Sequence, residues 1–481
     1  MPGVAFADWG EMQVVPHVLG VAHPTGYPSY ILLAWLAQLA PLGSVAFRAN
    51  LLSAILVAAT LATVVLISTR LGVRPLIAAA GGLALGLVGT VWAAATVAEV
   101  NPLHLLLVAL ILHRALVWED RLRVRDLALG GLLIGLALGN HLLTLFIAPF
   151  VAVYVLWVGR RALAARPWLV LVPVATAALG LSVYLYVPLA AAADPPLAYN
   201  HPLTLQAVLW LVTGEQFRGQ FDFLSSKGPG EFIAALPALA GLLGDRATPL
   251  FALLGLVGLP ALVGRRPAFG LTCLGLLAIG AYLWANYLRL EHYLLVPWLL
   301  LAVSATVGVD RLADLLARRR HGAARLEVGT VVGVVALALV VLLGIRDLPA
   351  ADRSGDRSGP TFVDAVFAAL PPGAAILSPW DASTPLWYGQ HVEGRRPDVL
   401  IVDDTNIVYE GWGTREARIA SLVCERPVYI IRLSDTDLVP TLRSYRLEPV
   451  ASVEVGAGGP SATRTQRLYR VSPLDPAACP G

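Results

Sequence analysis

Long apolar runs fill most of residues 29–345, and they constrain the fold of this 481-residue chain more than any other feature. A helix that crosses a bilayer needs about 20 consecutive apolar residues. The composition agrees, because 57% of the residues are hydrophobic and only 14% are charged, whereas soluble domains contain about 25% charged residues. The sequence therefore predicts a polytopic α-helical membrane protein and excludes a soluble enzyme. The net charge of +3 gives no indication of a nucleic-acid partner.

About ten membrane spans follow from these runs. The candidate spans are residues 47–69, 75–96, 102–118, 126–140, 142–158, 167–190, 248–263, 267–286, 293–314 and 327–345. Two shorter apolar stretches, 29–41 and 232–243, the latter broken by Pro237, predict re-entrant or interfacial helices. Five arginine clusters then fall on one side of the membrane, at residues 70–74, 121–125, 160–166, 265–266 and 318–325. We expect that side to be the cytoplasm, because cytoplasmic loops are enriched in arginine and lysine.

The composition changes after the last span. Residues 346–360 are polar, with glycine and proline breakers, and predict a linker. Residues 361–481 then predict an extracytoplasmic α/β domain, with strands at 374–379, 398–403 and 427–433 and a helix at 414–423. Its aromatic and acidic residues Trp380, Asp381, Trp387 and Tyr388 either contact sugar or form its core. A disulfide is permitted there, but the sequence does not show whether Cys424 and Cys479 pair.

The first segment of the chain carries the residues best suited to chemistry. Asp8 and Glu11 stand three residues apart, just before an apolar region, and a carboxylate at a membrane surface can act as a general base. The alternative is a capping box, in which Asp8 merely caps a helix. The following HPTGYP run adds His23 and Tyr27 to stiff backbone, which a simple helix start does not need.

Other polar residues map to turns on the same predicted side of the membrane. Glu99 and His104 flank the start of a span, and Asn101 either caps that helix or lines a pocket with them. Asn140 and His141 interrupt 32 apolar residues, either as a turn or as part of the pocket.

Arginines in the outer loops are candidates for binding an anionic lipid phosphate, which suits the guanidinium fork. Arg218 either has this role or pairs with Glu215 on the surface, and Arg289 and Arg48 are the other candidates. His201 and His292 complete the predicted pocket. The histidines are scattered, so no metal site is predicted. A divalent cation between Asp8 and Glu11 is possible but unsupported, and no cofactor is certain.

Several motifs resemble a known family of membrane enzymes. They are DWGE (8–11) with the run that follows it, VAEVNPLH (97–104), LALGNHLLTLFIAP (136–149), VPLAAAADPPLAYNHP (187–202) and LWYGQHVEGRRPDVLIVD (386–403). The family is glycosyltransferase family 117, the transmembrane protein O-mannosyltransferase-like proteins of the GT-C superfamily. The resemblance implies that residues 1–345 form a GT-C-like catalytic domain.

The resemblance also implies a reaction. A sugar, with mannose as the family-level guess, passes from a polyprenyl-phosphate carrier to a hydroxyl of a protein or glycan acceptor, with inversion. The base maps onto Asp8 or Glu11, with Asp8 preferred and Glu11 orienting the acceptor. The expected location is a bacterial inner membrane. Family members have a membrane helix before the acidic motif, whereas seven residues precede Asp8 here, so we expect the natural chain to begin further upstream.

The alternative function is a lipid-linked-glycan transporter or a non-catalytic glycolipid-binding protein. Such proteins place polar groups near the bilayer midplane on broken helices. Few such groups are found, because Glu99 and His141 both map to turns.

Overall fold

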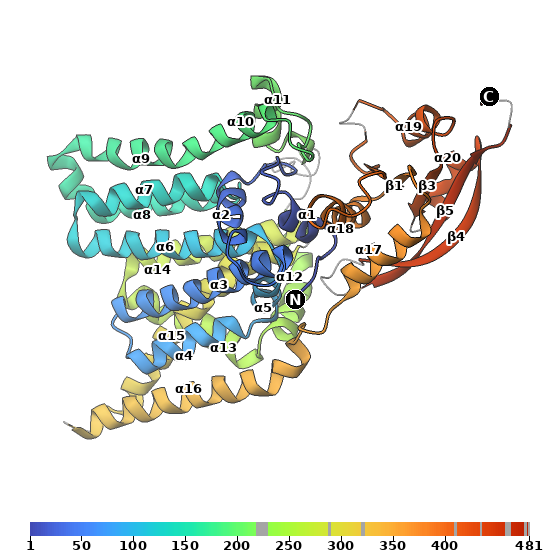
Figure 1. Ribbon diagram of the computed structural model, residues 1–481. Coiled ribbons are helices and arrows are strands. Elements are labelled where there is room, and N and C mark those ends of the chain that lie inside the picture. The colour runs from blue at the N-terminus through green and yellow to red at the C-terminus, as the bar shows by residue number, and fades with distance from the viewer. Residues whose placement is uncertain are drawn as a thin grey trace.

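A helical bundle with a sheet-containing domain at one end makes up the structure (Figure 1). This computed structural model describes residues 1–217, 229–286, 290–318, 323–407, 411–432, 435–456, 463–475 and 479. Two predicted phosphate-binding residues, Arg218 and Arg289, lie outside the described residues.

The bundle confirms the polytopic helical class. Within the described residues, seven helical stretches are long and apolar enough to span a membrane: α3 (Val45–Arg70), α6 (Val100–Arg121), α8 (Thr144–Ala165), Pro167–Ala192, α14 (Pro267–Asn286), Glu291–Leu316 and Glu327–Ala351. Two bent pairs raise the number to as many as nine: α4 (Pro75–Gly86) with α5 (Gly89–Thr96), and Phe232–Arg246 with α13 (Pro249–Arg265).

Some of these stretches contain several helices. Pro167–Ala192 comprises η1 (Pro167–Val170), α9 (Leu171–Leu181), η2 (Ser182–Leu185) and α10 (Tyr186–Ala192). Glu291–Leu316 comprises η4 (Glu291–Leu294) and α15 (Leu295–Leu316), and α16 covers Ala323–Ala351. Outside them lie α1 (Ala7–Val14), α2 (Pro28–Gln38), α7 (Val124–Leu138), α11 (Leu205–Val212), η3 (Glu215–Phe217) and α12 (Pro229–Arg246).

Two predicted elements differ from the structure. The apolar stretch at 232–243 was predicted to be broken at Pro237, but α12 runs through this proline. The chain then turns by 119° into α13, a geometry compatible with the predicted re-entrant helix. The predicted span at 126–140 is α7, whose 15 residues are fewer than the roughly 20 needed to cross unaided. By contrast, the short stretch at 29–41 forms the short helix α2.

The arginine-rich turns gather at the end of the bundle away from the C-terminal domain. The amide of Ala46, at the start of α3, donates to the Tyr388 hydroxyl of that domain. Arg70 is the last of the 26 residues of α3, so the helix is about 39 Å long. At that end the turns are joined by the ion pairs Arg70–Asp120, Arg266–Asp120, Arg74–Asp310 and Arg265–Asp310.

The C-terminal domain contains a five-stranded sheet with strand order β2-β1-β3-β5-β4. The predicted strands are confirmed as β1 (Ala375–Ser378), β2 (Leu400–Asp403) and β3 (Val428–Arg432), and β1 pairs in parallel with the other two. An antiparallel hairpin, β4 (Tyr445–Gly456) and β5 (Thr463–Pro473), extends the sheet beyond β3. Its helices are α17 (Ser358–Ala369), α18 (Trp380–His391), α19 (Arg415–Leu422), η5 (Asp435–Leu438) and α20 (Val439–Leu442).

The structure also describes the two cysteines of this domain and the predicted linker that precedes it. Cys424 and Cys479 form a disulfide. The predicted linker, residues 346–360, is helical at both ends, because α16 continues to Ala351 and α17 begins at Ser358.

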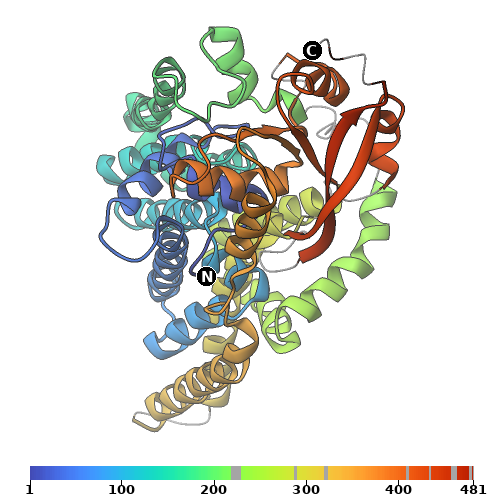
Figure 2. The ribbon, with the colours of Figure 1, turned by 45° about the vertical axis from the view of Figure 1, so that its right-hand side comes forward.

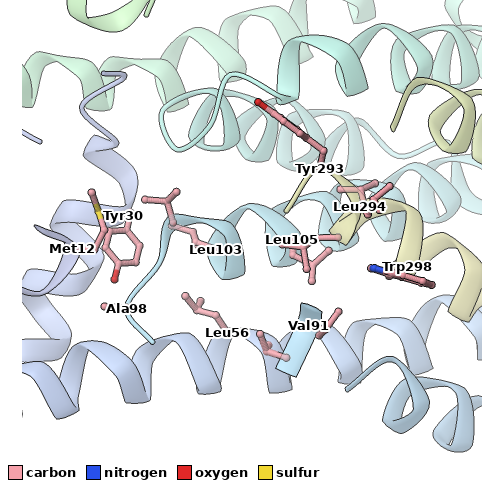
Figure 3. Close-up of a cluster of buried hydrophobic side chains, with 14 of the residues drawn as sticks. Met12, Tyr30, Leu56, Val91, Ala98, Leu103, Leu105, Tyr293, Leu294 and Trp298 are labelled. Carbon is pink, nitrogen blue, oxygen red and sulfur yellow. The ribbon is translucent and has the colours of Figure 1, made fainter. Parts of the chain in front are cut away.

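One buried core runs from the bundle into the C-terminal domain. Phe6, just before α1, packs edge-on against Phe362 of α17 with ring centroids 5.5 Å apart. Figure 2 shows α17 passing beside the N-terminus. Deeper in the bundle, Met12 and Tyr30 lie together next to Ala98 (Figure 3). Burial of these side chains fixes α1 against the turn between α5 and α6, where the polar candidates gather.

Candidate active site

Helix α1 presents its two carboxylates in different environments. Asp8 is exposed to solvent, whereas Glu11 is 2% exposed. The helix begins at Ala7 with Phe6 as its N-cap, and no side chain caps it. The capping-box alternative is therefore wrong, because both carboxylates lie inside the helix and are engaged elsewhere.

Glu11 is held by His23. One carboxylate oxygen accepts the backbone N–H of His23 at 2.8 Å, and the other accepts from the Nδ1 of its ring. Burial lowers the pKa of His23, but the nearby carboxylates of Glu11 and Asp8 outweigh burial and raise this pKa to about 9. The imidazole therefore stays protonated at neutral pH. Glu11 is thus a partner of His23, while Asp8 remains open to solvent.

The HPTGYP turn positions Tyr27 against the same histidine. Gly26 has a φ of +78°, a left-handed backbone conformation that favours glycine, and Pro28 then starts α2. The Tyr27 hydroxyl donates to the Pro24 carbonyl at 3.0 Å and lies 3.1 Å from His23 Nε2. The turn was predicted to be functional because of its stiffness, and its geometry brings the tyrosine and the histidine together.

A tryptophan of the C-terminal domain closes the other side of the carboxylate. The indole Nε1 of Trp380 donates to Asp8 Oδ1 at 2.7 Å. Its ring meets the His23 ring edge-on, with centroids 5.7 Å apart. The sequence suggested Trp380 as a sugar contact or a core residue, and nothing in it indicated this hydrogen bond across 372 positions.

A row of histidines continues from Tyr27 into the bundle. The Tyr27 ring lies 6.4 Å from that of His141, which in turn lies 5.2 Å from His104 and 6.4 Å from His292. His104 Nε2 is also 3.2 Å from the Thr144 hydroxyl. Burial lowers the pKa of His141 well below its ordinary value, and the neighbouring histidines add to this. The predicted pocket histidines 23, 104, 141 and 292 therefore share one region.

Glu99 borders the same region. Burial raises its pKa to about 7, and the nearby Asp8 carboxylate contributes in the same direction. Glu99, rather than Asn101, is the N-cap of α6, and its side chain accepts from the Val100 amide at 2.9 Å. The interpretation of Asn101 as the cap is therefore wrong, because the helix begins one residue before it. Asn140 donates from its side-chain amide to the Val100 carbonyl at 2.9 Å, which ties the α7–α8 turn to the start of α6.

Other predicted residues lie apart from this cluster. Arg48 donates to the Ala40 carbonyl at 2.6 Å and braces the α2–α3 turn. His201 is exposed. Within the described part of the chain, no group of three or more histidine, cysteine or acidic side chains is arranged to hold a metal ion.

A mostly apolar cavity of about 700 Å³ is lined by parts of α4, α5, α13, α15 and α16, and none of the site residues described above lines it. Arg246, at the end of α12, also lines it and pairs with Glu291 at 2.6 Å. The other carboxylate oxygen of Glu291 accepts from the Thr90 hydroxyl at 2.9 Å. Glu291 is followed directly in the chain by His292, which belongs to the histidine row. Arg246 was not among the predicted arginines.

The fold defines the class: this is a polytopic membrane protein with the fold of GT-C glycosyltransferases. ArnT from Cupriavidus metallidurans bound to undecaprenyl phosphate aligns with 100% of this chain and 96% of its own, with a TM-score of 0.59 and 15% identity. AglB, the Archaeoglobus fulgidus oligosaccharyltransferase in complex with an inhibitory peptide and a dolichol-phosphate, aligns with 89% of this chain and 66% of its own, with a TM-score of 0.51 and 11% identity.

Sequence comparison finds a more specific similarity for the first third of the chain. Residues 8–163 match the family of the protein O-mannosyl-transferase TMEM260 N-terminal domain. The mouse protein O-mannosyl-transferase TMEM260 is 35% identical over 156 residues, which are 31% of this chain and 21% of the mouse protein. The resemblance seen in the motifs is thereby confirmed, over a stretch that includes the acidic pair and His141. The alignment spans about a fifth of the mouse relative.

Proposed function

We propose that this protein is a membrane glycosyltransferase that moves a sugar from a polyprenyl-phosphate carrier to a hydroxyl of an acceptor. The observation that carries this proposal is the exposed carboxylate of Asp8, held by Trp380 at the edge of a cluster that also contains the Glu11–His23 pair. A carboxylate that is fixed but open to solvent suits a general base.

In the proposed reaction Asp8 takes the proton of the acceptor hydroxyl. The hydroxyl oxygen forms a bond to the anomeric carbon from the face opposite the phosphate, and the bond from that carbon to the phosphate oxygen breaks with inversion. The electron pair leaves with the polyprenyl phosphate. Glu11 orients His23 rather than the acceptor, since both of its oxygens are occupied by that residue.

The leaving phosphate gains negative charge in the transition state, so positive groups near it lower the barrier. Arg218 and Arg289 remain proposed for this role on sequence grounds. Arg246 is proposed with them, because it lines the mostly apolar cavity and pairs with Glu291, the residue before His292. Glu99, His104, His141 and His292 are proposed to line the donor sugar pocket together with Tyr27.

The nature of donor and acceptor is supported by the relatives. ArnT is described with undecaprenyl phosphate and AglB with a dolichol-phosphate and a peptide, and the mouse relative is named an O-mannosyl-transferase. We assign a polyprenyl phosphate to this donor, with mannose as its sugar and a protein hydroxyl as acceptor. The apolar cavity beside Arg246 has the character needed for an isoprenoid chain.

The proposed orientation places the arginine-rich turns in the cytoplasm and the C-terminal domain outside it, in a bacterial inner membrane. The clustering of arginines at one end of the bundle supports this orientation. A disulfide in the C-terminal domain also suits an oxidising compartment.

The test uses purified protein, undecaprenyl-phosphate mannose with a radiolabelled sugar, and a serine- and threonine-rich peptide library. Asp8→Asn should lower the transfer rate by about 10²- to 10⁴-fold, while donor binding and the melting temperature stay near wild type. If Asp8→Asn and Glu11→Gln both leave transfer intact, the base is assigned wrongly. Donor binding without sugar release by the wild-type protein would instead favour a lipid-linked-glycan transporter.

A further inference from the structure

The indole of Trp380 is held in place by contacts other than its hydrogen bond to Asp8. Its backbone N–H donates to the Thr405 hydroxyl at 2.9 Å at the start of α18. Its ring also meets Trp387 and Tyr199 edge-on, with centroids 5.6 and 6.4 Å away. A side chain confined by contacts of this kind delivers its Nε1–H in one direction, so the donor is pre-organised rather than selected from many rotamers.

The helix that carries Trp380 is itself docked closely on the helix that carries Asp8 (Figure 1). A Cβ atom added to Gly10 of α1 would lie 2.7 Å from the Thr384 hydroxyl of α18, so the two helices approach closely only because this residue is glycine. Further along α18, the Tyr388 hydroxyl accepts the Ala46 amide of α3 at 3.0 Å. The C-terminal domain therefore contacts the bundle at two places, through the packing of α18 on α1 and through the hydrogen bond between Tyr388 and Ala46.

From these contacts we infer that Trp380 is a positioning residue for proton abstraction by Asp8, and that the C-terminal domain thereby completes the catalytic site. The inference rests on the proposed function. With Oδ1 accepting from the indole at 2.7 Å, the plane of the carboxylate is set and Oδ2 is left to receive the acceptor proton. The indole touches neither the sugar nor the acceptor in this role; it acts through Asp8.

The experiment compares full-length wild-type protein with Trp380→Phe, using undecaprenyl-phosphate mannose and the peptide acceptor that the wild type modifies. Loss of the N–H should lower kcat on the order of 10- to 100-fold, because the base is no longer held in its productive orientation. The acceptor KM should change less than threefold.

Two further variants separate positioning from folding. Replacement of Trp380 by benzothienylalanine keeps the fused ring and removes only the donor, so it should reproduce the kinetic change at an unaltered melting temperature. If the phenylalanine variant fails to fold, the benzothienylalanine variant alone tests whether Trp380 positions Asp8. Trp412→Phe is the matched control, because Trp412 lies in the same domain but packs under Arg418, and it should behave as wild type.

The remaining outcomes are distinct. If the wild type transfers sugar and the benzothienylalanine variant matches its kcat, Trp380 does not position the base, and the proposed function stands. A change in acceptor KM alone would make Trp380 an acceptor contact and overturn the inference as well. If the wild type transfers no sugar at all, the proposed function fails and this inference fails with it. In the Asp8→Asn background, Trp380→Phe should have no further effect on the residual rate.

Discussion

At the scale of single residues, Glu11 and His23 hold one proton between them in a buried pair. Burial raises the pKa of Glu11, and the pKa of His23 is raised from its ordinary 6.5 to about 9. Both pKa shifts make the free energy of unfolding fall as the pH rises, because in each case the folded protein keeps a proton that the unfolded chain releases more easily.

The pH dependence of stability should follow from this pair. The stabilisation from His23 is fully present below about pH 6.5 and is lost as the pH rises through about 9. We expect the melting temperature in detergent to fall between these values. In His23→Gln the fall should be much smaller, since the titrating imidazole is gone. Equal pH slopes for the two proteins would contradict the assignment of the proton.

A second prediction concerns a buried aspartate at the opposite end of the bundle. Asp310 is 3% exposed and accepts from Arg74 at 2.7 Å and from Arg265 at 2.9 Å. Asp310→Asn leaves two arginines without their shared carboxylate and should cost about 3–5 kcal/mol in the free energy of unfolding, measured by titration with a denaturing detergent. Asp347→Asn is the control, because its pair with Arg346 is largely exposed and is worth about 1 kcal/mol or less.

The sequence predicted the acidic pair, and the family resemblance favoured Asp8 as the base, but neither indicated that Glu11 is buried against His23. The division of roles between the two carboxylates depends on contacts made by residues 12 and 372 positions away. Spacing within α1 shows only that Asp8 and Glu11 share a helix face. Which one is buried depends on how the HPTGYP turn and α18 pack on that face, and this is set by tertiary structure.

At the scale of elements, the close contact of α1 with α18 depends on one glycine. A Cβ atom at Gly10 would lie 2.5 Å from the Ala5 carbonyl and 2.7 Å from the Thr384 hydroxyl. Gly10→Ala should therefore force the helices apart and lower the free energy of unfolding by about 1–3 kcal/mol. It should also reduce transfer, because Trp380 moves away from Asp8.

The control for this substitution is Gly130→Ala in α7. Nothing lies within 4 Å of the position that its Cβ would take, and alanine is the better helix former by about 1 kcal/mol. This variant should be as stable as wild type or slightly more stable. If Gly10→Ala behaves in the same way, the packing of α1 on α18 tolerates separation.

Elements with strong apolar periodicity were predictable, and those that depend on neighbours were not. The strands β1 and β3 are buried at every position, so their apolar runs identify them. The hairpin strand β5 has only four buried positions in eleven residues and carries no such run. In α12, Pro237 indicated a break, but the helix continues through it.

At the scale of the whole molecule, the segregation of charge predicts how the chain sits in the membrane. The structure brings the arginine-rich turns to one end and the carboxylate cluster to the other, as the parity of the predicted spans required. The sequence was sufficient for this because each span reverses the chain direction. The sequence did not predict how the C-terminal domain docks on the bundle, because local sequence patterns do not indicate which distant segments will form an interface.

Cysteine labelling in intact cells tests this orientation. The described native cysteines are buried or disulfide-bonded, so a cysteine introduced on the surface is the site of reaction. With the proposed orientation, a membrane-impermeant maleimide should label Ala368→Cys in α17 from the non-cytoplasmic side of the membrane. It should label Arg160→Cys only after the membrane is opened. Both of these positions are exposed in the structure. Labelling of both from the same side would refute the topology.

The hydrogen bond between Asp8 and Trp380 can form only late in synthesis of the chain, because its two residues are made at different times. A ribosome delivers the carboxylate among the first residues it makes, yet the indole emerges only after α16, the last of the membrane helices, has been synthesised. Under the proposed mechanism, a half-made chain therefore has its acid group but lacks the partner that orients it. The proposal thus implies that transfer begins only after translation has passed into the final domain and that domain has docked on the bundle.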